Sequence, residues 1–564
     1  MNGLQKTDIN HRSSLSLWWI GLCLLIVITV ILSFLRLSTP DLWTDEVLSQ
    51  TKFAHIDDNI KQIARDVHPP MYFILSWWWI ALTNPLTEAG LRAFSALFAV
   101  FNVVLVVILG RYLVHRTFGL LAGLVITLSP FLLQYSRMHR YYSLMVFWVI
   151  LALVFLFSQS KKNYWWGIRC GLANLGLIYT NYLGAIFILG QAVILPFTYP
   201  KERRIWVKWL LGQLVIVVGF LPWLFVMAHQ AARGNIAYEL TKEPAPFFVI
   251  AIAKLKAVVY KFMYAGYVFI IGETTFPWMW VITIPAILLV IISVVFLLRR
   301  HGPPARPMRI LLGYGLSILI IVVVLSEAYA KVFSFQSFAL LPSRLLPLSP
   351  ILLVAVVYGL YRISNPIAKT VLIVLFLVTE AYGTWHYFAQ DQYLNPKYIV
   401  PWRKSVEYII DRSPGVSLSC TDESSFFYYN NRLNGPPAYG VMDLLQGIRH
   451  VGDPEKPLTL WIISRYRGDP GIRLAYHELD AFCRETFAIM SDTAFAPINP
   501  KLRQFLSKIT GEPAPSNILS ITQYSVPLSQ IGIDGIEQAM NDFLNKEPSR
   551  KRILGWISNS KNVD

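Results

Sequence analysis

Long apolar runs recur through the first two thirds of this chain and constrain its fold more than any other feature. The first run, Leu17 to Leu37, contains no acidic residue. A helix that crosses a bilayer needs about 20 predominantly apolar residues. Ten further runs begin near Phe94, Phe118, Tyr142, Trp165, Leu183, Val207, Trp278, Leu311, Leu345 and Val371. The sequence therefore predicts a polytopic α-helical membrane protein with about eleven spans.

The distribution of charge predicts the orientation of these spans. Only 15% of the residues are charged, against about a quarter in a soluble domain. The net charge of +17 would suit a nucleic-acid-binding protein, but the basic residues cluster in short loops at every second span boundary. These loops carry Arg111/Arg116, Lys161/Lys162, Lys201–Lys208, Arg299–Arg309 and Arg362/Lys369. Since basic loops stay in the cytoplasm, we expect an inner-membrane protein with a cytoplasmic N-terminus and no nucleic-acid partner.

Two apolar segments do not fit this count as spans. His68 to Leu82 is short and carries three consecutive tryptophans, which favour the membrane interface. Pro246 to Ile271 is interrupted by Lys254, Lys256 and Lys261. We interpret both as juxtamembrane helices on the outer face, the first of them in an outer loop over residues 38–90. If both segments are counted as spans, the total is thirteen spans. The N-terminus and the C-terminal domain then keep the same predicted sides of the membrane.

The composition changes after Tyr387, which marks a boundary between a membrane domain (1–387) and a soluble domain (388–564). Short β-like runs occur at 415–420, 458–464 and 521–528, and helical patterns at 402–412 and 535–545. Alternating strands and helices predict an α/β domain. An odd number of spans puts this domain outside the cytoplasm, where Cys420 and Cys483 could pair. The loop Cys420–Asn431 follows an expected strand, and we favour a plain surface loop over a ligand site there.

Two adjacent carboxylates, Asp45 and Glu46, follow the first span directly. Val47 and Leu48 open an amphipathic segment after them, and Thr44 is expected to cap the resulting helix. A carboxylate half-buried at the lipid interface is costly unless it has a partner or a function. Such a carboxylate is a candidate general base.

Several segments resemble those of one family. They are "LWTDEVLSQ" (42–50), "HPPMYFILSWWW" (68–79), "LRAFSALFAV" (91–100), "YSRMHRYYSLMVF" (135–147), "SRLLPLSPILLVAVVYGL" (343–360) and "YIVPWRKSVEYIIDRSPG" (398–415). With these segments in this order, the chain is similar to bacterial members of the GT-C glycosyltransferase superfamily. Those members are relatives of the protein O-mannosyltransferases and of the lipid A aminoarabinose transferase. The resemblance covers the membrane part and the start of the soluble domain.

The resemblance implies an inverting glycosyltransferase of the cell envelope. Such enzymes move a sugar from a polyprenyl-phosphate carrier to an acceptor hydroxyl on the outer face of the cytoplasmic membrane. The family's catalytic carboxylate falls on Asp45, which would be the general base. Glu46 would orient the acceptor or help to hold Mg²⁺ or Mn²⁺, although two carboxylates fall far short of a coordination set. The acceptor is open between lipid, protein and glycan, and the sugar between hexose and pentose.

A phosphate-bearing donor requires cations, and the sequence offers several. Arg140 and Tyr142 match an Arg and a Tyr of the family, while Arg137 and Met138 replace its usual Gln-Glu pair. His139 lies among them, and guanidinium groups bind phosphate through paired hydrogen bonds. The remaining candidates for donor binding are His68, Arg344 and Lys331. Outer-leaflet anchoring is the alternative explanation for these arginines.

Two other functions compete with transfer. A transporter or flippase of lipid-linked sugars should show paired charges inside several spans and internal symmetry. A surface-polysaccharide ligase or polymerase generally carries its long outer loop late in the chain, whereas the acidic loop here is the first. A glycosyltransferase is the leading hypothesis.

Overall fold

The computed structural model describes residues 2–51, 63–64, 68–84, 87–158, 165–239, 259, 262–299, 306–332, 342–413, 415–440, 443–451, 453, 456–465, 470–510 and 514–546. It divides into two compact units. The first contains Met1–Ser38 and Ser49–Leu394, and the second contains Thr39–Leu48 and Asn395–Asp564. A short piece of the first loop therefore belongs to the same unit as the end of the chain.

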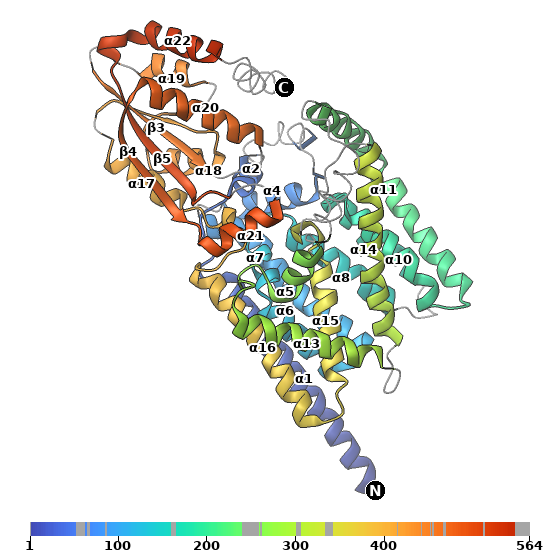
Figure 1. The fold of residues 1–564 in the computed structure, drawn as a ribbon. Helices are drawn as coiled ribbons and strands as arrows, with labels where there is room; N and C mark the ends of the chain where they lie inside the picture. The colour runs from blue at the N-terminus through green and yellow to red at the C-terminus, as the bar shows by residue number, and fades with distance from the viewer. Residues whose placement is uncertain are drawn as a thin grey trace. The chain divides into compact units, whose positions relative to one another are not determined.

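The first unit is helical (Figure 1). Its helices are α1 (Asn2–Phe34), α4 (Met71–Thr83), α5 (Glu88–Leu113), α6 (Arg116–Leu128), α7 (Pro130–Ser136), α8 (Tyr142–Phe157), α9 (Trp166–Thr180), α10 (Gly184–Thr198), α11 (Arg203–Glu239), α13 (Trp280–Leu298), α14 (Arg306–Val332), η2 (Pro342–Leu345), α15 (Leu348–Tyr361) and α16 (Pro366–Ala389). A helix over Phe262–Ile271 also lies here, whereas Lys254, Lys256 and Lys261 of the second expected juxtamembrane helix lie outside the described residues.

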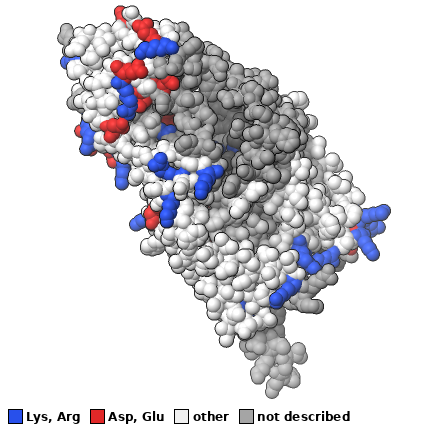
Figure 2. Space-filling model, in the orientation of Figure 1, with Lys and Arg blue, Asp and Glu red and all other residues white. Residues whose placement is uncertain are grey.

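Within the described residues, five helices are long and apolar enough to cross a bilayer, or six if the bent pair α6–α7 forms one span. They are Ser16–Phe34, Glu88–Leu113, Arg203–Ala228, Trp280–Leu298 and Pro366–Ala389. Shorter apolar helices, such as α8 and α15, lie among them, and the expected total of eleven to thirteen stays a prediction. Large apolar side chains stand exposed on these spans, for example Phe225 (75%) and Val281 (85%). Figure 2 shows this helical surface as mostly free of charge, as expected of a multi-pass membrane protein.

Helix α4 begins directly after Pro69 and Pro70, as the two prolines predict. Its residues Tyr72, Phe73 and Ser76 are buried, while Ile74, Trp78 and Leu82 are 42%, 57% and 78% exposed. Residues four apart share one face of a helix. The exposed face is therefore an apolar stripe, which suits contact with lipid.

Helices α9 and α11 pack through glycines. Added Cβ atoms at Gly167 and Gly171 would lie 2.1 Å from the Lys208 carbonyl oxygen and 1.9 Å from the Gly212 carbonyl oxygen. Gly167 and Gly171 are four residues apart, which is the small-residue spacing that lets two membrane helices approach closely.

Helices α6 and α7 meet at an angle of 65°. The break falls at Pro130, the first residue of α7, whose ring contacts the backbone at Gly272 and Gly383. An added Cβ would lie 2.5 Å from the Pro130 Cγ at Gly272 and 2.7 Å from it at Gly383. Gly272 also has a φ of 94°, which favours glycine. The bend therefore depends on two close glycines in distant parts of the sequence.

The second unit contains a five-stranded sheet in the order β2-β1-β3-β5-β4. Strand β1 is parallel to β2 and β3, and β5 is antiparallel to β3 and β4. The strands are β1 (Ser417–Cys420), β2 (Ala438–Tyr439), β3 (Leu458–Arg465), β4 (Ala488–Pro497) and β5 (Asn517–Val526). The helices are η3 (Pro396–Tyr398), α17 (Trp402–Asp411), α18 (Ser424–Arg432), α19 (Leu444–Val451), α20 (Pro470–Thr486), α21 (Pro500–Thr510) and α22 (Leu528–Lys546). Strands β1, β3 and β5 coincide with the three β-like runs of the sequence.

Both cysteines of this unit are free thiols in its hydrophobic core. Burial raises the pKa of the Cys420 thiol, and it does the same for Cys483. These thiols therefore stay protonated and act as small apolar core residues.

Candidate functional site

The adjacent acids Asp45 and Glu46 lie in the first turn of helix α2 (Thr44–Thr51). Glu46 is fully buried, and its Oε2 accepts the Trp43 backbone N–H at 3.2 Å. The Val47 N–H in turn donates to the Trp43 carbonyl at 3.2 Å, so Trp43 is the residue that caps α2. Glu46 thus contributes half of a capping box, and the expectation that Thr44 caps this helix is wrong.

Asp45 differs from its neighbour in exposure. Its side chain is half-buried, whereas Glu46 is 0% exposed. Asp45 is therefore the more accessible member of the pair. The Glu46 carboxylate, occupied at the helix start, is poorly placed to serve as a metal ligand, and no cluster of three His, Cys, Asp or Glu residues able to hold a metal occurs in the described part of the chain.

The start of α2 is bound by the rest of the second unit. The Thr44 Oγ1 donates to Glu423 Oε2 at 3.2 Å, and the Leu42 N–H donates to the Tyr429 hydroxyl at 2.9 Å. The Glu423 Oε1 lies 3.2 Å from Arg465 Nε in an ion pair that is almost completely buried. The segment Cys420–Asn431, expected to be a surface loop, is instead mostly helix α18, and its buried Glu423 contacts the helix that carries Asp45.

Two further contacts hold residues 41–43. The Arg403 N–H donates to Asp41 Oδ2 at 2.8 Å. The Trp43 ring packs edge-on against Tyr398 at 4.9 Å, and the Lys397 ammonium lies 5.2 Å from the Trp43 ring centroid. The sequence gives no sign of these contacts, because the partners are more than 350 residues apart and come from different kinds of segment.

In the first unit, the predicted donor-binding residues 137–142 form the connection between α7 and α8 and the first turn of α8. Arg137, His139, Arg140 and Tyr142 are all buried, with at most 5% of each residue exposed. The structure brings them into one connection but gives each a different set of partners.

Arg137 binds the end of helix α1. Its Nη1 donates to the carbonyls of Leu32 at 2.6 Å and Ser33 at 3.3 Å, and its Nη2 donates to the Arg36 carbonyl at 3.0 Å. Its Nε donates to the Tyr387 hydroxyl at 3.0 Å. A cation at the C-terminal carbonyls of a helix is stabilising. These bonds account for Arg137 without a phosphate.

Arg140 has a different environment. Its Nη1 donates to the Ser49 hydroxyl at 3.0 Å. Its guanidinium also lies 5.3 Å from the Tyr141 ring centroid. The half-buried His68 ring packs against that same tyrosine at 5.2 Å, so Tyr141 brings His68 and Arg140 together.

His139 and Tyr142 make internal contacts. The His139 Nδ1 lies 3.0 Å from the Leu91 carbonyl oxygen and 3.2 Å from the Tyr72 hydroxyl. An acceptor carbonyl requires that Nδ1 carry the proton. The Tyr142 ring packs edge-on against Tyr135 at 5.0 Å. His139 thereby links α4 to α5, and Tyr142 supports the α7 side of the connection.

The last two predicted donor-binding residues are less fully described. Arg344 lies half-buried in the short helix η2. Lys331 lies near the end of α14, and its side chain is outside the described part of the chain. Neither lies in the connection between α7 and α8.

Sequence reasoning missed a buried acid, Glu273, in the loop before α13. Its Oε2 accepts from Gln134 Nε2 at 2.8 Å and from the Tyr135 hydroxyl at 3.1 Å, and its Oε1 accepts from the Tyr264 hydroxyl at 3.0 Å. An isolated acid between apolar segments is the only signal that could have indicated it. Glu273 holds α7 in place from the side of the bend.

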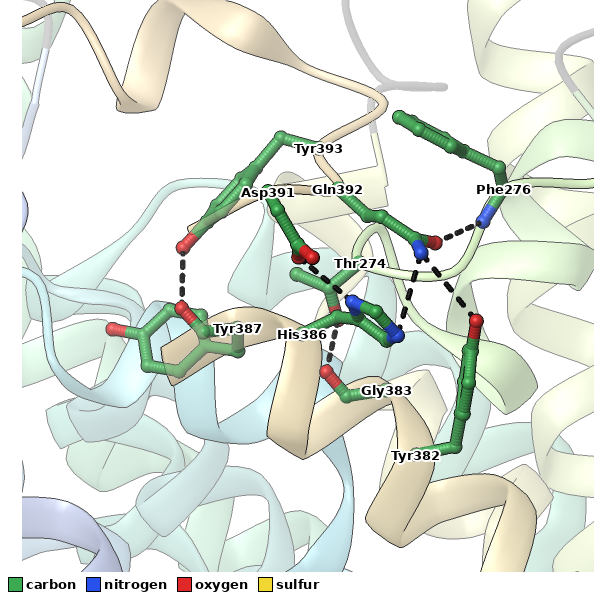
Figure 3. Close-up of polar contacts among 9 residues, drawn as sticks. All are labelled: Thr274, Phe276, Tyr382, Gly383, His386, Tyr387, Asp391, Gln392 and Tyr393. Atoms are coloured by element: carbon green, nitrogen blue, oxygen red, sulfur yellow. Dashed lines mark hydrogen bonds and ion pairs between the residues drawn. The ribbon is translucent and has the colours of Figure 1, made fainter. Parts of the chain in front are cut away.

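The same loop is joined to the end of α16 (Figure 3). The Thr274 hydroxyl donates to the Gly383 carbonyl at 2.7 Å, and the Phe276 N–H donates to the Gln392 side-chain oxygen at 3.4 Å. The His386 Nδ1 lies 2.7 Å from Asp391 Oδ1. These bonds hold residues 390–394 against the loop that carries Glu273. Because Glu273 binds α7, they also stabilise the position of α7.

Comparisons with known proteins agree with this architecture. Residues 67–225 match the family model described as dolichyl-phosphate-mannose-protein mannosyltransferase. No curated protein matches the sequence significantly. The apo crystal structure of ArnT from Cupriavidus metallidurans is similar over 90% of this chain and 97% of its own, with a TM-score of 0.52 and 12% identity.

A weaker likeness extends to an oligosaccharyltransferase from Archaeoglobus fulgidus, which covers 90% of this chain and 88% of its own at a TM-score of 0.45 and 8% identity. The fold is similar to that of ArnT, and the family match includes His68, the connection 137–142 and helices α4 to α10. This chain is therefore a multi-pass membrane protein with the fold of ArnT, and its residues 67–225 are similar to the protein mannosyltransferase family.

Proposed function

We propose that the chain is an inverting glycosyltransferase that takes a sugar from a polyprenyl-phosphate carrier and transfers it to an acceptor hydroxyl outside the cytoplasm. The observation that carries this proposal is the partial exposure of Asp45, beside the fully buried Glu46, at the start of α2 in a chain with the fold of ArnT. The relative with the same fold supports the class of donor, since ArnT from Cupriavidus metallidurans has also been solved bound to undecaprenyl phosphate.

The chemical step follows from these groups. The acceptor oxygen attacks the anomeric carbon as the bond between that carbon and the carrier phosphate oxygen breaks. The acceptor proton moves to the Asp45 carboxylate, and the carrier leaves as polyprenyl phosphate. Attack opposite the leaving group inverts the anomeric centre. General-base assistance of this kind contributes about 10²- to 10⁴-fold to a rate.

Arg140 is the cation that we assign to the carrier phosphate, with His68 beside it. Arg140 binds Ser49 on α2 and shares Tyr141 with His68, whereas Arg137 is occupied by the carbonyls of α1. A guanidinium suits a phosphate because it donates paired hydrogen bonds. Arg344 and Lys331 stay secondary candidates, and Glu46 acts by holding the start of the helix that carries Asp45.

The test compares transfer by wild type, Asp45→Asn and Asp58→Asn. Asp58 is an acid of the same loop to which we assign no role. Purified full-length protein receives a radiolabelled polyprenyl-phosphate sugar and membrane extract. Asp45→Asn should lower transfer at least about a hundredfold, and Asp58→Asn should keep it. Undiminished transfer in Asp45→Asn refutes the general base. Movement of the labelled lipid across vesicles with no covalent product would favour a transporter.

A further inference from the structure

The strand order of the C-terminal sheet contains a reversal of the kind at which α/β domains bind ligands. Strands β2, β1 and β3 are parallel and adjacent in that order. The chain leaves β1 toward β2 on one side and returns to β3 on the other. In open α/β sheets, ligands bind outside the carboxyl ends of the strands at such a reversal. The ends of β1 and β3 are therefore the expected ligand site of this domain.

Two opposite charges lie at that site. Glu423 follows β1 and immediately precedes α18, and Arg465 is the last residue of β3. Their ion pair is 3.2 Å long, with the Arg465 side chain 9% exposed and the Glu423 side chain 1% exposed. Charged side chains are rarely buried unless they are paired. This pair lies at the position where a ligand would be recognised.

Residues of the chain's own first loop lie at these strand ends. The Glu423 Oε2, opposite the oxygen that meets Arg465, accepts the Thr44 hydroxyl at 3.2 Å. The hydroxyl of Tyr429 on α18 accepts the Leu42 N–H at 2.9 Å. Both bonds fall on the first turn of α2 and on the residues just before it. The domain thus binds residues 42–44 where other α/β domains bind a small molecule.

We infer that the C-terminal domain is the receptor for the helix that carries Asp45, and that Glu423 is a positioning residue for the transfer reaction. Glu423 fixes Thr44, the residue before Asp45, and Arg465 balances its charge and holds its orientation. This inference depends on the proposed function for its catalytic consequence. The docking of residues 42–44 onto Glu423 can be measured without any activity.

The cleanest probe is Thr44 and not Glu423. Glu423→Gln would leave the buried Arg465 charge without its ion pair and could unfold the domain. Thr44→Val keeps the shape of the side chain and removes the hydroxyl, while Thr44→Ser keeps the hydroxyl. Comparing the two variants therefore distinguishes the effect of losing the hydrogen bond from the effect of changing the side-chain packing.

The experiment uses full-length protein in detergent and two measurements. Thr44→Val should speed amide hydrogen exchange over residues 43–50 and lower kcat about ten- to a hundredfold, the effect of one hydrogen bond to a charged acceptor. The KM for the polyprenyl-phosphate sugar should change little. Thr44→Ser should restore both exchange protection and kcat.

Unchanged exchange over residues 43–50 in Thr44→Val overturns the docking role of Glu423. Faster exchange with an unchanged kcat overturns its positioning role. Failure of the proposed function gives a different result, because Asp45→Asn would then keep its activity while Thr44→Val still shows faster exchange.

Discussion

At the scale of single residues, neighbouring side chains of the same charge differ in their burial and in their bonding partners. Asp45 and Glu46 are adjacent acids, yet Glu46 is buried at the helix cap and Asp45 is half-buried. Arg137 and Arg140 differ in the same way, since Arg137 binds three backbone carbonyls and Arg140 binds a hydroxyl on α2. Residue type alone therefore does not distinguish structural from functional charges.

The two arginines should respond differently to substitution. Arg137→Lys keeps the charge but loses the fork that reaches several α1 carbonyls, and we expect it to destabilise the protein by about 1.5–3 kcal/mol. Arg140→Gln should instead raise the KM for the polyprenyl-phosphate sugar about tenfold or more. Thermal melting in detergent and initial-rate kinetics measure the two effects. The assignment is wrong if Arg137→Lys changes donor KM and Arg140→Gln does not.

The sequence predicts part of the proposed site, and these roles stay predictions. Asp45, His68 and Arg140 were all indicated by the family resemblance. The resemblance does not predict the structural role of Arg137. Its partners are backbone carbonyls, and these leave no pattern in a sequence. Glu423 was taken for a surface residue because its partner Thr44 is 379 residues away and lies in another kind of segment.

At the scale of elements, the apolar runs and the β-like runs indicated α1, α5, β1, β3 and β5 because each buries a continuous or alternating apolar face. The sequence does not predict strand β4 (Ala488–Pro497). As an edge strand it is largely exposed, and its polar and apolar residues do not alternate regularly. The sequence does not predict the bend at Pro130, because the bend depends on Gly272 and Gly383 from distant parts of the chain.

The contact between α9 and α11 gives a prediction at this scale. Gly171→Ala places a Cβ 1.9 Å from the Gly212 carbonyl oxygen, and overpacking of this kind costs about 1–3 kcal/mol. Gly313→Ala on α14 is the matched control, since no described atom lies within 4 Å of its added Cβ. It should be neutral or stabilise by up to about 1 kcal/mol. Melting temperatures in detergent compare the two, and an equal loss in both would contradict close packing at Gly171.

At the scale of the whole molecule, the chain combines a lipid-exposed helical unit with a unit built on a five-stranded sheet. The helical unit exposes large apolar side chains, whereas the sheet unit carries surface ion pairs such as Arg484 with Asp480 and Asp492. The two surfaces suit lipid and water, respectively. Charge in the short loops then predicts which side of the membrane each loop faces.

Cysteine labelling in intact cells tests that orientation. Lys501→Cys lies in α21 of the sheet unit and should react with a membrane-impermeant maleimide. Lys201→Cys lies in the basic loop between α10 and α11 and should react only after the cells are opened. Wild type is the control, because its sheet-unit thiols are buried. The opposite labelling pattern would reverse the predicted orientation and place Asp45 in the cytosol.

The sharing of residues 39–48 with the C-terminal unit has a consequence for biogenesis. The ribosome adds about 5–20 residues each second, so roughly 20–80 s separate the synthesis of Thr44 from that of Glu423. During that interval the nascent chain contains Asp45, but Glu423, which binds the neighbouring Thr44, has not yet been synthesised. Competence for catalysis would then arise only after the C-terminal domain has been synthesised.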